Sequence, residues 1–277
     1  MGEIDIKSNL ENEYDIPFVV TKSLDKGEPV FVLEPEDDSK ELFGIKVSFR
    51  NRVRLCMDFI PHKYSATFIE TMSHQPDENR RRFAQYAELI SSKGAKCTIS
   101  ANGLLLDLAN PEGWPENWKD FKARVTKMPI EADGEALYSE VVNTWGSLMM
   151  GMVLSLANIV PVEDDLSVPG YSEGDLRRVE INRYERNPLN RKLCLEIKGY
   201  NCAICGMNFE GKYGNIGHHF IHVHHVIPVS KIGPGYIIDP VKDMIPVCPN
   251  CHAMLHRKEP PYTPDELKII VEEMQKE

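Results

Sequence analysis

Two pairs of cysteines in the C-terminal part of this 277-residue chain have the spacing of metal ligands. Each pair has two residues between its cysteines, and a long stretch of sequence separates the pairs. The four residues are Cys202, Cys205, Cys248 and Cys251. Thiolates in two such knuckles bind zinc tetrahedrally and leave no coordination position for water or substrate. The spacing therefore predicts a structural Zn²⁺ that stabilises the fold rather than performing catalysis.

Histidines lie between and after these cysteines. His224 and His225 are adjacent, and neighbouring side chains in an extended segment point to opposite faces. His252 and His256 are four residues apart, so a helix that begins at the second knuckle would place both imidazoles on one face. Imidazoles with few carboxylates suit a divalent ion that keeps positions open for water and phosphate. The pattern indicates hydrolysis of phosphodiester bonds, which needs a base for water and a metal for the phosphate charge.

The motifs that contain these residues resemble the HNH endonucleases. They are Cys202-Ala-Ile-Cys205, Ile221-His-Val-His-His-Val-Ile-Pro228 and Val247-Cys-Pro-Asn-Cys-His-Ala-Met-Leu-His256. The resemblance is strongest to the restriction-type, McrA-like branch with a four-cysteine zinc site, and it extends over roughly residues 176–270. It implies a ββα-metal fold, in which a hairpin and a helix surround one metal ion. No family resemblance is identified for the N-terminal part.

The resemblance implies a role for each matching residue. His225 corresponds to the general base that activates water. His224 and His252 correspond to ligands of a catalytic Mg²⁺, Mn²⁺ or similar ion, and His256 to a further ligand or a phosphate contact. The asparagine of the family name falls at Asp243, where this sequence departs from the pattern. That residue braces the loop bearing the base, and a carboxylate there would also favour protonated His225.

Charge is unevenly distributed along the chain. The whole sequence has 32 Lys and Arg against 42 Asp and Glu, a net charge of −10 that argues against nucleic acid as a partner. Residues 176–258, however, carry twelve Lys and Arg and six Asp and Glu, a net charge of +6, which leaves −16 for the remainder. Basic residues before the first knuckle would hold DNA phosphates, or else form a solvated helix face. The predicted DNA contacts are Arg183, Arg186, Arg191 and Lys192.

The predicted fold class is α+β, with a mixed N-terminal domain at 1–161, an acidic linker at 162–175 and a nuclease domain at 176–277. Alternating apolar residues predict two strands, and Pro76 and Gly94 bound a helix. Asn102-Gly103 predicts a hairpin turn. The predicted elements are strands at 45–49, 53–59, 96–101 and 104–108, and helices at 75–93 and 135–159.

The stretch from Val141 to Val162 has no charged residue and is long enough to cross a membrane. Several polar residues interrupt it, and acidic rather than basic residues follow, so a buried helix or a dimer-forming helix is the preferred interpretation. The alternative is a membrane span. The N-terminus has no signal-peptide pattern, and paired cysteines typical of metal binding favour a reducing, cytoplasmic location.

Other residues have a structural and a functional interpretation. The run Arg80-Arg81-Arg82 favours a solvated helix face over phosphate binding. Trp114 and Trp118 favour core packing over a cage for an extruded base. Core positions are also favoured for the remaining cysteines, which are Cys56, Cys97 and Cys194. A role as an extra metal ligand or phosphate contact remains open for three histidines, which are His218, His219 and His222.

We therefore expect a metal-dependent DNA endonuclease of the restriction or defence type. The McrA-like resemblance suggests that its N-terminal domain reads methylated or hydroxymethylated cytosine. One alternative is an effector nuclease that a partner or ligand activates, without sensing of modified DNA. Another is a non-catalytic zinc module that binds nucleic acid. Because one HNH site cuts one strand, double-strand cleavage would need a homodimer or successive nicks.

Overall fold

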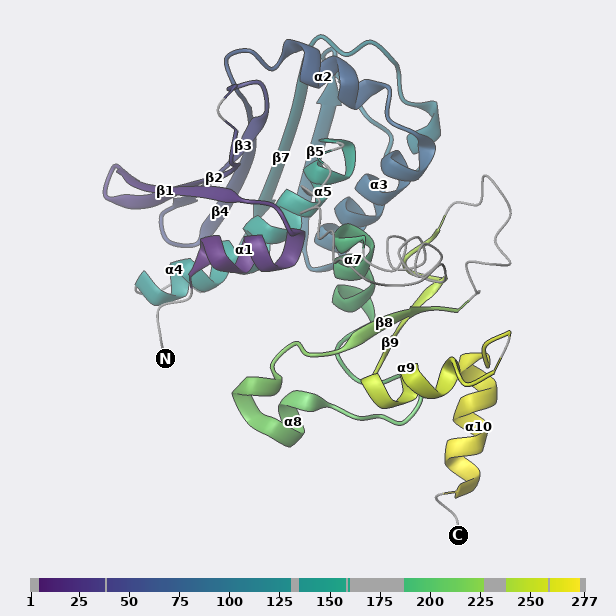
Figure 1. Cartoon of the computed structure of the whole chain (residues 1–277). Helices are drawn as coiled ribbons and strands as arrows, with labels where there is room; N and C mark the ends of the chain where they lie inside the picture. Colours follow the sequence, from purple (N-terminus) through teal and green to yellow (C-terminus); the bar gives the residue numbers. More distant parts are fainter. Residues whose placement is uncertain are drawn as a thin grey trace, which may run out of the picture. The chain divides into compact units, whose positions relative to one another are not determined.

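The computed structural model of the protein describes residues 5–37, 39–130, 135–157, 159, 187–226, 238–258 and 260–274. The chain forms two units, Met1–Asp165 and Leu166–Glu277 (Figure 1). The predicted α+β class is confirmed, because the first unit combines a sheet with helices and the second contains a hairpin and helices. The predicted linker at 162–175 lies outside the described residues, so the exact domain boundaries stay a prediction.

A seven-stranded antiparallel sheet forms the frame of the first unit, with the strand order β1-β2-β3-β4-β7-β5-β6. Its strands are β1 (Phe18–Asp25), β2 (Glu28–Pro35), β3 (Phe43–Arg50), β4 (Arg54–Pro61), β5 (Ala95–Ala101), β6 (Leu104–Leu105) and β7 (Phe121–Lys127). The helices are α1 (Ile6–Tyr14), α2 (Ala66–Ser73), α3 (Asp77–Ser92), α4 (Glu135–Val141) and α5 (Ser147–Ala157), with a short 3₁₀ turn η1 (Pro111–Gly113) and a π-helical segment η2 (Val142–Gly146).

The alternating residues that predict strands at 45–49 and 53–59 do pair in the sheet. Ile45 lies opposite Phe59 and Val47 opposite Met57, and all four side chains are buried. The hairpin at Asn102-Gly103 is also confirmed, since both residues have positive φ. Its second strand is shorter than predicted and ends at Leu105.

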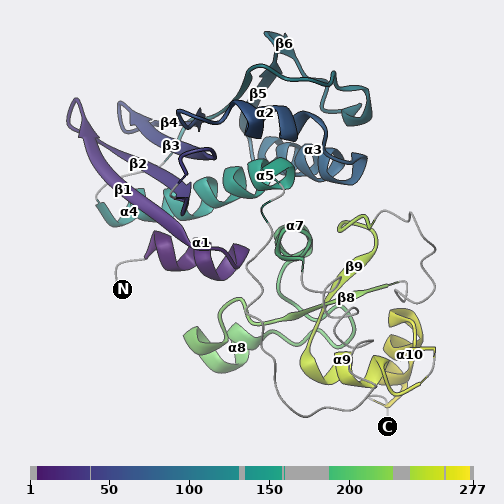
Figure 2. The ribbon, with the colours of Figure 1, turned by 45° about the horizontal axis from the view of Figure 1, so that its top comes forward.

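Helices α3 and α5 pack on one face of the sheet (Figure 2). All eleven residues of α5 are buried, which confirms a buried helix between 147 and 157. Dimerisation through this helix stays a prediction. Among the described residues, every helix is too short or too polar to cross a membrane.

Gly151 allows α5 to approach two tyrosines. A Cβ at this position would lie 2.7 Å from the hydroxyl oxygen of Tyr14 and 2.7 Å from Cζ of Tyr86. We expect Gly151→Ala to lower the free energy of unfolding by about 1–3 kcal/mol, because an overpacked core must displace its rings. Urea denaturation of the full chain measures the loss.

Gly146→Ala provides the matched control for this prediction. Its Cβ would meet one atom closely, the Cδ1 methyl of Leu33 at 2.7 Å, and the next atoms lie at 3.6 and 3.7 Å, so a single methyl has to give way. We expect a smaller loss than for Gly151→Ala. An equal or larger loss at Gly146 would contradict the assignment of the effect to the tyrosine rings.

The arginine run on α3 corrects one expectation. Arg80 and Arg82 are buried, and only the middle residue, Arg81, is on the surface. Arg80 donates from Nη2 to the Ser73 carbonyl at 2.6 Å, so it joins two helices rather than facing solvent. Trp114 and Trp118 are buried, as core packing predicts, and each indole N–H donates to a backbone carbonyl.

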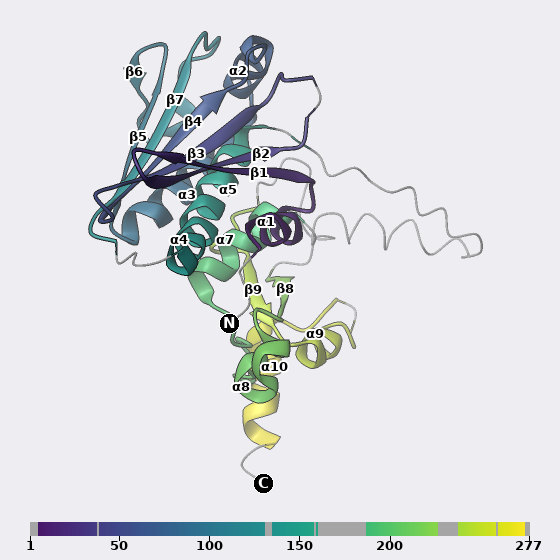
Figure 3. The same cartoon turned by 90° about the vertical axis from the view of Figure 1, so that its left-hand side faces the viewer.

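The second unit has a small core around a two-stranded sheet (Figure 3). Its elements are α7 (Pro188–Lys198), α8 (Phe209–Tyr213), the 3₁₀ turn η3 (Gly214–Gly217), β8 (His222–His225), β9 (Met244–Val247), α9 (Pro249–Leu255) and α10 (Pro264–Met274). Asn187 begins α7 by accepting hydrogen bonds from Leu189 and Asn190, with Pro188 at the first helical position. The order of β8, β9 and α9 is that of the expected hairpin and helix.

Candidate metal centres

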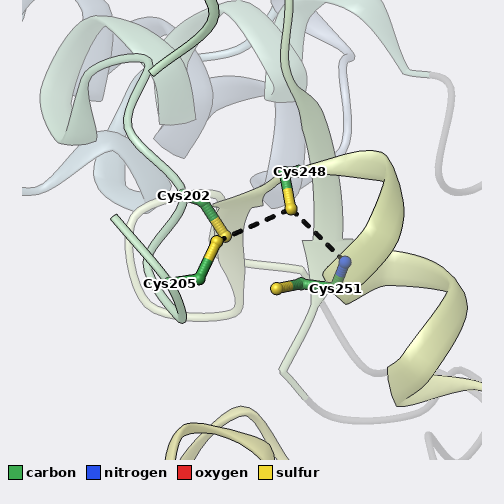
Figure 4. Close-up of side chains that lie close together, drawn as sticks. All are labelled: Cys202, Cys205, Cys248 and Cys251. Carbon is green, nitrogen blue, oxygen red and sulfur yellow. Dashed lines mark hydrogen bonds between the residues drawn. The ribbon is translucent and has the colours of Figure 1, made fainter. Parts of the chain in front are cut away.

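The four predicted zinc ligands come together. Cys202 and Cys205 lie in a turn after α7, whereas Cys248 precedes α9 and Cys251 lies in its first turn. Figure 4 shows the four side chains gathered between the turn and the helix, and their sulfur atoms all lie within 4.8 Å of one another. The sulfurs of Cys205 and Cys248 are 3.7 Å apart. Four thiolates about 2.3 Å from zinc would be about 3.8 Å apart, so the cluster fits this ion.

Backbone hydrogen bonds hold the first knuckle, Cys202 to Cys205, independently of a metal ion. Gly206, with a φ of 72°, turns the chain so that its N–H donates to the Cys202 carbonyl at 2.9 Å. The N–H of Ala203 donates to the Pro246 carbonyl at 2.9 Å and so attaches the knuckle to β9. Burial and the neighbouring thiols strongly raise the pKa of Cys251, so a nearby cation is needed for the four sulfurs to ionise together.

A second cluster joins three of the predicted histidines. His224 in β8 faces His252 in α9 and His256 at the end of that helix, and one ring nitrogen of each lies within 4.8 Å of the others. The three ring centroids are 5.0 to 5.2 Å apart. Within the described part of the chain, Nδ1 of His224 and Nε2 of His252 are buried without a hydrogen-bond partner. A divalent ion would satisfy these nitrogens, so the residues fit a metal.

The electrostatics of the cluster suit metal binding. Burial, reinforced by the other histidines, lowers the pKa of His224 to about 3 and that of His252 to about 4. Both rings are therefore neutral near pH 7, and their lone pairs are available to an ion without loss of a proton.

His225 follows His224 in β8 but does not join the three-histidine cluster. Its side chain is 2% exposed, and neither ring nitrogen has a hydrogen-bond partner among the described residues. Burial lowers the pKa of His225, while the negative charge of Asp243 acts in the opposite direction. The burial effect is larger, so the ring is neutral and able to accept a proton.

Asp243 connects the hairpin at the start of β9. Its carbonyl accepts a hydrogen bond of 2.7 Å from the N–H of Val226, the residue after His225. Its carboxylate accepts 2.8 Å from the N–H of Asp239 and so fixes the turn before β9. The segment bearing His225 is thus held by the backbone of Asp243, and the side chain acts on His225 through its charge.

The predicted DNA contacts are only partly described. Arg191 in α7 donates from Nη2 to the Ile221 carbonyl at 2.9 Å, just before β8. Lys192 is buried, and its ammonium group is 3.4 Å from a carboxylate oxygen of Glu196. Arg183 and Arg186 lie outside the described residues. The four contacts stay predictions, and the charge of Lys192 is compensated by Glu196 within its own helix.

His222 is placed beside the cluster although the motif assigns it no role. It is exposed, and its ring centroid is 5.4 Å from that of His252. Residues two apart on a strand share a face, so the spacing His222-Val-His224 contains a signal for this position.

The part of the chain that contains both clusters also matches known proteins. A family model described as HNH endonuclease matches residues 202–258, which include all the candidate ligands, His225 and Asp243. This chain carries an HNH endonuclease domain. The HNH domain thus accounts for the hairpin, the following helix and the metal clusters that the motifs predict.

A longer similarity supports the McrA-like branch. The chain is 30% identical over 151 residues to the type IV methyl-directed restriction enzyme EcoKMcrA of Escherichia coli (strain K12). The similarity covers 48% of this chain and 50% of the E. coli protein, so the chain spans about half the length of this relative. No solved structure matches the chain.

We expect His252→Ala and His256→Ala to weaken binding of Mn²⁺ to the HNH domain without releasing zinc. Each change removes one of three imidazoles, so the affinity should fall at least about 10- to 100-fold, the range seen when even supporting residues of a metal site are lost. Isothermal titration with Mn²⁺, together with zinc analysis, measures both sites. Unchanged Mn²⁺ affinity in both variants would contradict the three-histidine site.

Proposed function

We propose that the protein is a metal-dependent endonuclease that hydrolyses phosphodiester bonds of DNA. The observation that carries this proposal is the cluster of His224, His252 and His256, with buried unpartnered nitrogens, next in the chain to the neutral His225. The match of residues 202–258 to HNH endonucleases supports the same activity.

In the proposed reaction, a nitrogen of neutral His225 accepts a proton from water as the water oxygen forms a bond to phosphorus. The bond between phosphorus and the leaving oxygen breaks, and that oxygen takes up a proton. His224, His252 and His256 would hold Mg²⁺, Mn²⁺ or a similar ion, which would stabilise negative charge on the phosphate and the leaving oxygen. The four-cysteine zinc would hold the knuckle against β9 and take no part in the chemistry.

We further propose that the N-terminal unit selects the DNA by reading methylated or hydroxymethylated cytosine. The support is the similarity to a methyl-directed restriction enzyme, together with a net charge of −10 over residues 1–165, which disfavours non-specific DNA binding. Such an enzyme would act in defence within the cytoplasm. A homodimer, or two successive nicks, would produce a double-strand break.

Matched plasmids test this selection. The full chain is incubated with unmodified, cytosine-methylated and hydroxymethylated DNA in Mg²⁺ or Mn²⁺, and with EDTA. We expect cleavage of modified plasmids with metal and none with EDTA. Equal cleavage of all three plasmids would contradict modification reading and leave the nuclease proposal standing. Cleavage only after addition of a partner or small ligand would instead favour an activated effector.

A further inference from the structure

An exposed row of rings lies next to the histidine cluster. Tyr213 at the end of α8 is 49% exposed, and Phe220, just before β8, is 48% exposed. His222, the first residue of β8, is exposed as well. These three side chains are called the aromatic rim below.

The aromatic rim is continuous with the candidate catalytic centre. The His222 ring is 5.4 Å from the ring of His252, a candidate metal ligand, and 6.1 Å from that of Phe220. Phe209, in the first turn of α8, connects the remaining members, with centroid distances of 4.9 Å to Phe220 and 5.8 Å to Tyr213. An unbroken series of ring contacts therefore leads from the metal centre to the surface.

The backbone of the rim segment is anchored to the core of the unit. Phe209 packs against the core of the unit. The chain returns towards Phe209 through Gly217, where a Cβ would lie only 2.3 Å from the Phe209 carbonyl oxygen, so this approach requires glycine. The N–H of Phe220 then donates to the Gly217 carbonyl at 3.2 Å. The backbone that carries Phe220 is therefore anchored next to Phe209, which itself packs on the core.

The charges beside the rim suit a polyanion. The ammonium group of Lys212 is 5.4 Å from the Tyr213 ring, and Arg191 binds the carbonyl of Ile221, which lies between Phe220 and His222. The same segment also carries the carboxylate of Glu210. This carboxylate lies 3.1 Å from the ring of His218, which would balance its negative charge when protonated. Rings among cations are the chemistry that binds single-stranded nucleic acid, because bases stack on rings while phosphates contact the charges.

We propose that the aromatic rim stacks the bases of an unpaired stretch of DNA whose phosphate lies at the histidine cluster. The inference rests on the proposed nuclease function and deepens it. The substrate is a duplex that is locally unpaired at the cleavage position, since paired bases present only their edges and not their faces.

A DNA-binding experiment tests this proposal without DNA cleavage. The full chain with the His225→Ala change is loaded with zinc and supplied with Mn²⁺. It is then titrated with two DNA duplexes that have one strand in common. One is fully paired, and the other has a short unpaired bubble that contains 2-aminopurine. We expect the bubble to bind about 5- to 150-fold more tightly, the equivalent of stacking one base, with quenching of the 2-aminopurine fluorescence.

Variants of the rim identify the stacking residues. Phe220→Ala and Tyr213→Ala, each in the same His225→Ala background, should remove the preference and the quenching, while Phe220→Trp should keep both. Ile216→Ala is the matched control, because Ile216 is 88% exposed in the same segment but has no ring. Zinc content and thermal melting verify that each variant is folded.

The outcomes separate the inference from the function on which it rests. Equal binding of both duplexes without quenching, or an equal loss in Ile216→Ala and Phe220→Ala, would overturn ring stacking while the nuclease proposal stands. Failure of the parent protein to bind any DNA would overturn both.

Discussion

His225→Ala is expected to abolish DNA cleavage while zinc content and folding are retained. The change removes the proposed base, and loss of general base catalysis typically costs about 10²- to 10⁴-fold in rate. Folding should survive because His225 contributes no side-chain hydrogen bond among the described residues, and the change removes two buried unpartnered nitrogens. Nicking of supercoiled plasmid gives the rate, and circular dichroism with zinc analysis gives the structural control.

The matched control is His74→Ala, an exposed histidine just after α2 that lies outside both clusters. It should cleave at the parent rate. Cleavage by His225→Ala at the parent rate would contradict the assignment of the base, and absence of cleavage in the parent as well would favour a non-catalytic zinc module.

Removal of zinc is the second change with a large expected effect. Cys251→Ser should release the ion and unfold the second unit, while the first unit remains folded. The core of this unit is small and includes Cys202, Cys248 and Cys251, so the ion joins elements that bury little apolar surface by themselves. Structural zinc contributes about 10–16 kcal/mol of apparent binding energy in small zinc-finger peptides, which exceeds the stability expected of such a core.

Hydrogen exchange followed by mass spectrometry measures this effect by region. Amides between residues 187 and 274 should exchange freely in Cys251→Ser, whereas those of the seven-stranded sheet should stay protected. Cys194→Ala is the matched control, because Cys194 is fully buried in the same core but lies outside the zinc cluster. Retention of zinc and of native protection in Cys251→Ser would contradict a structural role for the cluster.

Local sequence patterns predicted much of the fold where the signal depends on neighbouring residues. The alternation at Ile45 and Val47, the turn at Asn102-Gly103 and the helix bounded by Pro76 and Gly94 are all present in the structure. The position of β7 between β4 and β5 was not predictable in this way. Its pairing joins residues from 55 to 127, and no short-range pattern reports a contact of that separation.

The burial of charged residues shows the same limit. Arg80 and Arg82 read as a solvated run, yet the carbonyl that binds Arg80 belongs to the preceding helix. The pairing of Lys192 with Glu196 follows the i,i+4 rule, so it was visible in the sequence and could have lowered the expectation of a DNA contact.

The candidate site was predicted well because its motifs fix both residue type and spacing. The two knuckles and the pair His252 and His256 lead to the two clusters found in the structure. The role of His222 depends on which side chains surround β8. The sequence does not give these neighbours, whereas the structure shows that the His222 ring lies near the rings of Phe220 and His252.

Metal-dependent hydrolysis of plasmid DNA in ¹⁸O-labelled water tests the central claim most directly. The full zinc-loaded chain is supplied with Mn²⁺ and with supercoiled plasmid that carries methylated, hydroxymethylated or unmodified cytosine. We predict nicked or linear DNA with one labelled oxygen on the terminal phosphate, and no product when Mn²⁺ is omitted from the zinc-loaded protein. Equal cleavage without Mn²⁺, or intact plasmid of all three kinds in the presence of Mn²⁺, would contradict a histidine-bound metal that hydrolyses DNA.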